Sequence, residues 1–132
     1  MANVEALIED DAADVDVYRI NHHGAETSSS EEFMEAIAPT VVIVSNGTQF
    51  DHPRDTVIQG ILGLDPEPVV YLTNRTERPL AWNAPAAQVA DEDYDDYDGI
   101  VEIAVWRQTC RVYRWRDGNR IDSGNQYQIK ER

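Results

Sequence analysis

Three histidines are the residues of this sequence whose types and spacing best suit chemistry, and no further imidazole exists in the chain. His22 and His23 stand directly before Gly24, and His52 follows a later apolar run. Neutral imidazole is the commonest transition-metal ligand, and a glycine lets backbone approach an ion or a phosphate. An isolated His-His pair is more often a surface or hydrogen-bonded pair, so these residues alone leave a structural role open.

Serines follow the histidine pair and form two overlapping capping boxes, Ser28 with Glu31 and Ser29 with Glu32. The free N–H groups and the dipole at a helix N-terminus attract an anion. We therefore expect Ser28, Ser29 and the later Asn46 to bind a substrate. Helix capping is the competing role for the serines.

The elements that must position these residues alternate along the chain. The pattern predicts a strand at 14–20, a helix from the serine cluster to Pro39, a strand at 41–44, a helix from Asp51 and Pro53 to Gly63, and a strand at 68–73. This β-α-β-α-β order favours a parallel sheet in an α/β layer, with a continuously apolar strand at 41–44 that is covered on both faces. Ligands bind at the carboxyl ends of such strands, so all three histidines should fall on one rim of the sheet.

The C-terminal third has a different pattern. Residues 75–98 contain prolines and a dense acidic run, and they predict an exposed insertion. Residues 100–106 and 109–115 predict an antiparallel hairpin that turns near Arg107. Cys110 should be buried in this hairpin, and Trp106 and Trp115 should pack within it.

The length and the charge of the chain limit the classes of protein to which it can belong. The 132 residues predict one domain, 1–132, and they contain no apolar run long enough to span a membrane. A single cysteine excludes an internal disulfide and a multi-cysteine zinc finger. No signal peptide is visible, so a cytoplasmic location is the default expectation. The net charge of −14 is unevenly spread: residues 1–100 have four basic and 21 acidic side chains, whereas residues 101–132 have seven and four. An acidic surface repels nucleic acid unless a local patch or a metal reverses the field.

Val15 is followed by DVYRINHHGAETSS at residues 16–29. The segment 15–29 resembles the metallo-β-lactamase-fold hydrolases, most closely the ComEC-like branch, which has an HHGS-x-T-S segment. The likeness continues over roughly residues 3–115. It includes the helix before Pro39 and the strands at 41–44 and 68–73. The Asp51-His52-Pro53 segment is similar to the family's GHP.

The resemblance implies a fold and a set of roles. The chain would be the C-terminal half of a metallo-β-lactamase-type αββα sandwich, β-α-β-α-β followed by the antiparallel hairpin. One histidine of the pair would bind zinc or another divalent metal such as manganese, and we favour His23. The neighbouring His22, with His52, would act on the ester oxygens of a small phosphoester or nucleic-acid substrate. The sequence does not order the two histidines of the pair.

The sequence also departs from the family pattern, because the H-x-H-x-D-H motif and the bridging aspartate are absent. A hydrolytic zinc site needs more ligands than remain here. We therefore expect the C-terminal portion of a metal-dependent hydrolase for phosphodiester or similar ester bonds, inactive until an N-terminal half completes it. An open half-sandwich also favours self-association. The alternative is a non-catalytic binding module derived from the same fold. A third reading, an acidic phosphate mimic for a basic partner, has only the charge to support it.

Overall fold

The computed structural model describes residues 5, 14–46, 52–73, 100–120 and 124–130. The predicted insertion at 75–98 and the residue Asp51 lie outside the described residues. The elements in chain order are β1 (Val17–Arg19), the short 3-10 turn η1 (Asn21–Gly24), α2 (Glu31–Ile37), β2 (Val41–Val44), α3 (Asp55–Leu62), β3 (Val69–Leu72), β4 (Val101–Trp106), β5 (Thr109–Arg116), β6 (Asn119–Arg120) and β7 (Asn125–Gln128).

The first sheet is parallel and has the order β1-β2-β3. Val41 lies opposite Val17 on one side and opposite Val69 on the other, so β2 is the central strand. All four residues of β2 are buried. The predicted β-α-β-α-β order and the two-sided burial of this strand are therefore confirmed, because a parallel strand between two layers has no solvent face.

Both helices begin later than the sequence patterns predict. The N-cap of α2 is Ser30, whose Oγ accepts a hydrogen bond from the Phe33 amide at 3.3 Å. Ser28 is unavailable as a cap because its hydroxyl donates to the carbonyl groups of Asn21 and Ala25. Helix α3 begins at Asp55, after an extended Arg54. The prediction of caps at Ser28 and Ser29 is thus wrong by one or two residues, since the chain first makes a tight turn.

The second sheet is antiparallel and begins with the predicted hairpin. β4 pairs with β5 from Val101 opposite Arg114 to Trp106 opposite Thr109. The polar strand β7 pairs with the other side of β5, and β6 pairs with its end. Sequence analysis missed β6 and β7, because Asn-Gln-Tyr-Gln has none of the apolar alternation that identifies a strand.

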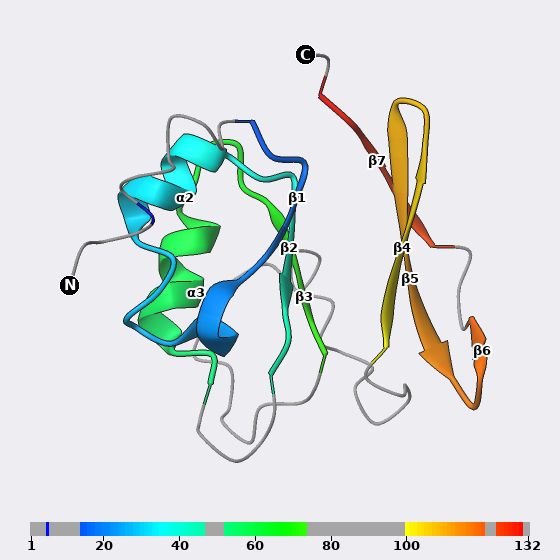
Figure 1. The fold of residues 1–132 in the computed structure, drawn as a ribbon, viewed down its shortest axis with the longest axis horizontal. Helices are drawn as coiled ribbons and strands as arrows, with labels where there is room; N and C mark the ends of the chain where they lie inside the picture. The colour runs from blue at the N-terminus through cyan, green and yellow to red at the C-terminus, as the bar shows by residue number, and fades with distance from the viewer. Residues whose placement is uncertain (1–4, 6–13, 47–51, 74–99, 121–123, 131–132) are drawn as a thin grey trace.

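The chain is arranged as helices, sheet and second sheet, in that order (Figure 1). Val42 and Val44 pack against α2 and α3 in one core, whereas Val41 and Ile43 face the second sheet in another. The two cores arise because successive side chains of a strand point to opposite faces. The result is a mixed α/β fold with one parallel and one antiparallel sheet. No helix among the described residues has the length and apolar character needed to cross a membrane.

Polar contacts also join the two sheets. The hydroxyls of Tyr71 on β3 and Tyr127 on β7 lie 2.6 Å apart, and Asn125 donates to Tyr71 at 2.9 Å. Burial raises the pKa of Tyr127 strongly, and the bond to Tyr71 adds to the shift. Near the C-terminus, the Lys130 amide donates to the Asp16 carboxylate at 2.7 Å. These bonds fix the second sheet against the inner face of the first.

Candidate functional site

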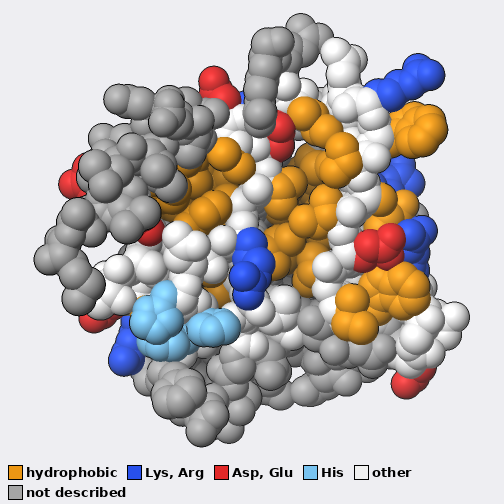
Figure 2. All heavy atoms as spheres, in the orientation of Figure 1, with side chains coloured by type: hydrophobic (Ala, Val, Ile, Leu, Met, Phe, Trp, Pro, Cys, Tyr) orange, Lys and Arg blue, Asp and Glu red, His pale blue; other side chains and the backbone are white. Residues whose placement is uncertain are grey.

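The histidine pair lies in a strained turn at the carboxyl end of β1. His22 and His23 occupy η1 with φ values of 46° and 58°, and Gly24 follows at 79°. Non-glycine residues adopt such left-handed backbone rarely, and backbone strain of this kind concentrates at functional sites. The turn directs the chain away from the sheet edge and presents two imidazoles there. Pale blue side chains gather at one end of the molecule in Figure 2, as the rim prediction requires.

His23 is oriented by the neighbouring strand. Its Nδ1 makes a short hydrogen bond with the carbonyl oxygen of Ser45, the residue that follows β2. A carbonyl only accepts, so His23 carries a proton on Nδ1, and in the neutral ring Nε2 has the lone pair. Metal-binding histidines commonly donate their second ring N–H to a backbone carbonyl in this way. Of the pair, His23 is the imidazole that is held in this arrangement.

His22 faces a different neighbour, His52, with the two ring centroids 6.1 Å apart. The Nδ1 of His22 lies 3.4 Å from the Thr27 hydroxyl. The Nδ1 of His52 is buried and has no hydrogen-bond partner among the described residues. Burial lowers the pKa of His52, and the positive charge of Arg54 lowers it further. His52 is thus a neutral imidazole with an unused nitrogen beside His22.

A close backbone contact holds the two histidine segments together. The Arg54 amide donates to the Gly24 carbonyl at 2.9 Å. A Cβ at Gly24 would lie 2.6 Å from the Pro53 Cβ and 3.2 Å from its Cα. Only glycine therefore permits both the left-handed turn and this approach, and the approach sets the separation of His22 and His52.

The serines bind an anion, but that anion comes from the chain itself. The amides of Ser29 and Ser30 donate to the two carboxylate oxygens of Glu5 at 2.6 and 2.9 Å. The Ser29 hydroxyl lies 3.2 Å from the Tyr18 hydroxyl. Glu5 was not identified from the sequence, since a lone carboxylate so far from the turn gives no local signal. The serine segment has the anion affinity expected of it, and an internal carboxylate uses that affinity.

The serines and the histidines do not share a pocket. Residues 28–31 line a pocket between α2 and α3 together with Glu26 and Thr56, and no histidine lines it. Asn46 follows Ser45 and is buried, and its backbone N–H donates to the Thr73 hydroxyl oxygen at 3.1 Å. The structure thus brings His22, His23 and His52 to one edge and places Asn46 just after β2, next to the residue that His23 binds. Ser28 and Ser29 line the pocket between α2 and α3, which no histidine lines.

The described residues do not form a full metal site. No group of three or more His, Cys, Asp or Glu side chains is arranged around one point in this part of the chain. A zinc ion at His23 would therefore need ligands other than those described.

Part of this sequence is similar to a known protein. ComE operon protein 3 of Bacillus subtilis (strain 168) is 37% identical over 46 residues, which cover 33% of this chain and 6% of that protein. The chain therefore matches only a small fraction of the length of this relative. No protein-family model matches the sequence, and no solved structure matches it either.

Proposed function

We propose that this chain is the C-terminal portion of a metal-dependent hydrolase that acts on phosphodiester or similar ester bonds and needs ligands from an N-terminal half. The observation that carries the proposal is the His23 imidazole, whose Nδ1 is bound to the Ser45 carbonyl while Nε2 remains a lone-pair donor at the carboxyl edge of the sheet. The partial identity to ComE operon protein 3 supports the same lineage and the metallo-β-lactamase-type αββα sandwich proposed with it.

The proposal assigns different tasks to the three imidazoles. His23 would hold the metal through Nε2. His22 and His52, as a neighbouring pair, would contact the ester oxygens, where neutral imidazole N–H groups can donate to developing negative charge. Arg54 lies near enough to His52 to depress its pKa, so it adds positive charge to the same edge.

The chain alone permits a first test. Nitrogen-15 NMR of the imidazoles should show His23 as the Nδ1–H tautomer, because the Ser45 carbonyl cannot donate a proton. Titration with zinc should then move the His23 Nε2 resonance before any other imidazole signal. An Nε2–H tautomer for His23 would contradict the ligand assignment.

Completion of the site is the second test. The chain is co-expressed with a polypeptide that carries the H-x-H-x-D-H motif and the bridging aspartate, and metal content and bis-(p-nitrophenyl) phosphate hydrolysis are measured. Both should appear together, and both should disappear in His23→Ala. His52→Ala should retain the metal and lose most hydrolysis, and Gln128→Ala, on the exposed face of β7, serves as the matched control. Hydrolysis that survives His23→Ala would refute the proposal.

A non-catalytic binding module is the second candidate, and the exposed apolar residues of β4 favour it. A partner that binds equally well after both His22 and His23 are replaced by alanine would support this candidate over the hydrolase.

A further inference from the structure

The strand β4 is an edge of the second sheet. Within the described part of the chain it pairs with β5 alone, through an unbroken register over all six of its residues. An edge strand presents a row of unpaired backbone groups, and proteins usually protect such edges with lysine, proline, a bulge or a very short strand. β4 has none of these features: its one charged residue is Glu102, and the Arg120 guanidinium already binds that carboxylate.

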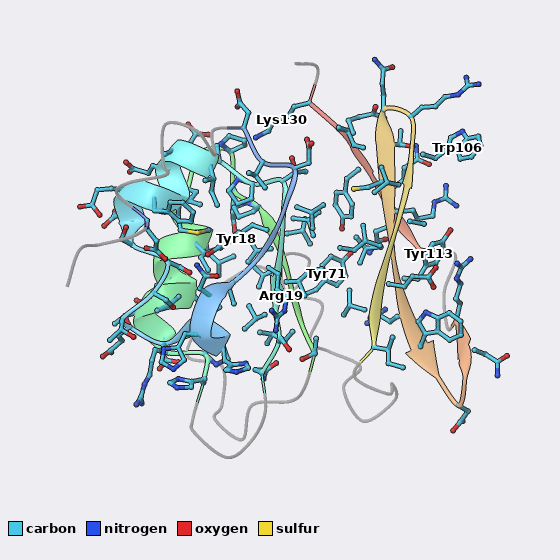
Figure 3. All side chains as sticks on the ribbon, in the orientation of Figure 1. Tyr18, Arg19, Tyr71, Trp106, Tyr113 and Lys130 are labelled. Atoms are coloured by element: carbon cyan, nitrogen blue, oxygen red, sulfur yellow. The ribbon has the colours of Figure 1, made fainter. Side chains whose placement is uncertain are left out.

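The apolar exposure of the described residues is concentrated on this same edge. Ile100, Val105 and Trp106 are 50%, 64% and 73% exposed, and they are the exposed large hydrophobic residues of the described chain. Figure 3 shows Trp106 directed away from the first sheet, whereas Tyr71 lies between the sheets. This corrects the sequence expectation that Trp106 packs within the hairpin. The opposite edge, β7, reads Asn-Gln-Tyr-Gln and offers no comparable surface.

We propose that β4 pairs antiparallel with β4 of a second copy of this chain, around a two-fold axis at Ile103. Antiparallel neighbours share a face, and on β4 the odd-numbered Val101 and Ile103 pack toward the first sheet. An axis at Ile103 places odd-numbered residues opposite odd-numbered residues and even-numbered residues opposite even-numbered residues, so opposed side chains share a face. Ile100 then faces Trp106 of the second copy, and Val101 faces Val105 of the second copy.

In this pairing each exposed large hydrophobic residue of β4 has an apolar residue opposite it, and Glu102 lies opposite Ala104. The next allowed register, with the axis at Ala104, places Glu102 opposite Trp106 and Val101 opposite Arg107. It also leaves Ile100 beyond the paired strand. Cross-strand apolar pairs stabilise a sheet and mismatched polar pairs do not, so the residues of β4 favour the Ile103 axis and a copy of the same strand.

Charge sets the conditions for this association. Each copy has a net charge of −14, but residues 101–132 have seven basic and four acidic side chains. Pairing through β4 therefore brings together two segments of positive net charge, in two chains that are each strongly acidic overall. Salt screens repulsion between like charges, with a Debye length of about 10 Å at 0.1 M. The dimer should consequently tighten when the salt concentration rises.

Sedimentation velocity over a wide concentration range tests the proposal on the full chain. The wild-type protein should show a reversible monomer–dimer equilibrium, and Trp106→Lys or Ile100→Glu should each weaken the dimer at least tenfold. Both side chains are half or more exposed, so both variants should keep the wild-type circular dichroism spectrum and melting temperature. Gln128→Lys places the same charge on the β7 edge and should leave the dimer unchanged.

Mixing distinguishes the register. In an equimolar mixture of Trp106→Lys and Ile100→Glu, the Ile103 axis places the new lysine opposite the new glutamate once, and the other pair stays wild type. The mixture should therefore form a heterodimer about as tight as the wild-type dimer. Hydrogen exchange should also slow in β4 as concentration rises. A wild-type protein that stays monomeric, a dimer insensitive to both variants, or a mixture without heterodimer would overturn the proposal.

Discussion

Replacement of Gly24 by alanine should destabilise the protein and separate the two histidine segments. The new Cβ would lie 2.6 Å from the Pro53 Cβ, a distance that real Cβ atoms do not adopt, so one of the two segments must move. A left-handed backbone costs a non-glycine residue about 1–2 kcal/mol, and overpacking of a filled site costs about 1–3 kcal/mol. The expected loss in the free energy of unfolding is therefore about 2–5 kcal/mol.

Two other glycines separate these contributions. Gly118 has a φ of 72° but nothing within 4 Å of an added Cβ, so Gly118→Ala should cost only the backbone strain, about 1–2 kcal/mol. Gly60 lies inside α3 with nothing within 4 Å, and Gly60→Ala should stabilise the protein by about 0.5–1 kcal/mol. The structure thus predicts the order of the three variants in free energy of unfolding, with Gly60→Ala the most stable and Gly24→Ala the least stable.

Urea unfolding at neutral pH measures all three free energies, and NMR of the imidazole protons reports on the site. Gly24→Ala should shift the resonances of His22 and His52, which Gly118→Ala should leave in place. If Gly24→Ala were no more destabilising than Gly118→Ala, the contact with Pro53 would not be as close as the structure has it, and our account of the spacing between the two histidines would fail.

Two further predictions concern the second sheet. The Arg120 guanidinium holds the pKa of Glu102 below its ordinary value, so this pair stabilises the fold above the pKa of an unfolded glutamate and ceases to do so as the carboxylate is protonated. The stability difference between wild type and Glu102→Gln, from urea unfolding between pH 7 and 3, should be constant at the upper end and decrease toward the lower end; a difference that does not change with pH contradicts it. Tyr127→Phe removes one partner of the buried Tyr71 hydroxyl and should cost about 1–3 kcal/mol in thermal or urea unfolding, and a variant as stable as wild type would show that the bond between the sheets contributes nothing.

The local patterns of the sequence were sufficient to predict the parallel sheet. Val41–Val44 is an unbroken β-branched run between two amphipathic helices, and its short length and β-branched residues favour a strand over a buried helix. The rim of histidines follows from the same order, because His22 and His23 come directly after one parallel strand and His52 comes after the next. Helix starts were less predictable, since Ser28, Ser29 and Ser30 are equivalent as caps until the turn before them is known.

The sequence by itself determined the parallel sheet, its two helices and the hairpin, and it also determined that three imidazoles meet at one edge, because these features depend on neighbours in the chain. Only the tertiary structure decided that His23 binds the Ser45 carbonyl, that Glu5 occupies the amides of Ser29 and Ser30, and that the polar strand β7 completes the second sheet. Each of these contacts joins segments far apart in the sequence. A hydrogen bond between such segments has no local pattern, since its geometry exists only after the layers have packed.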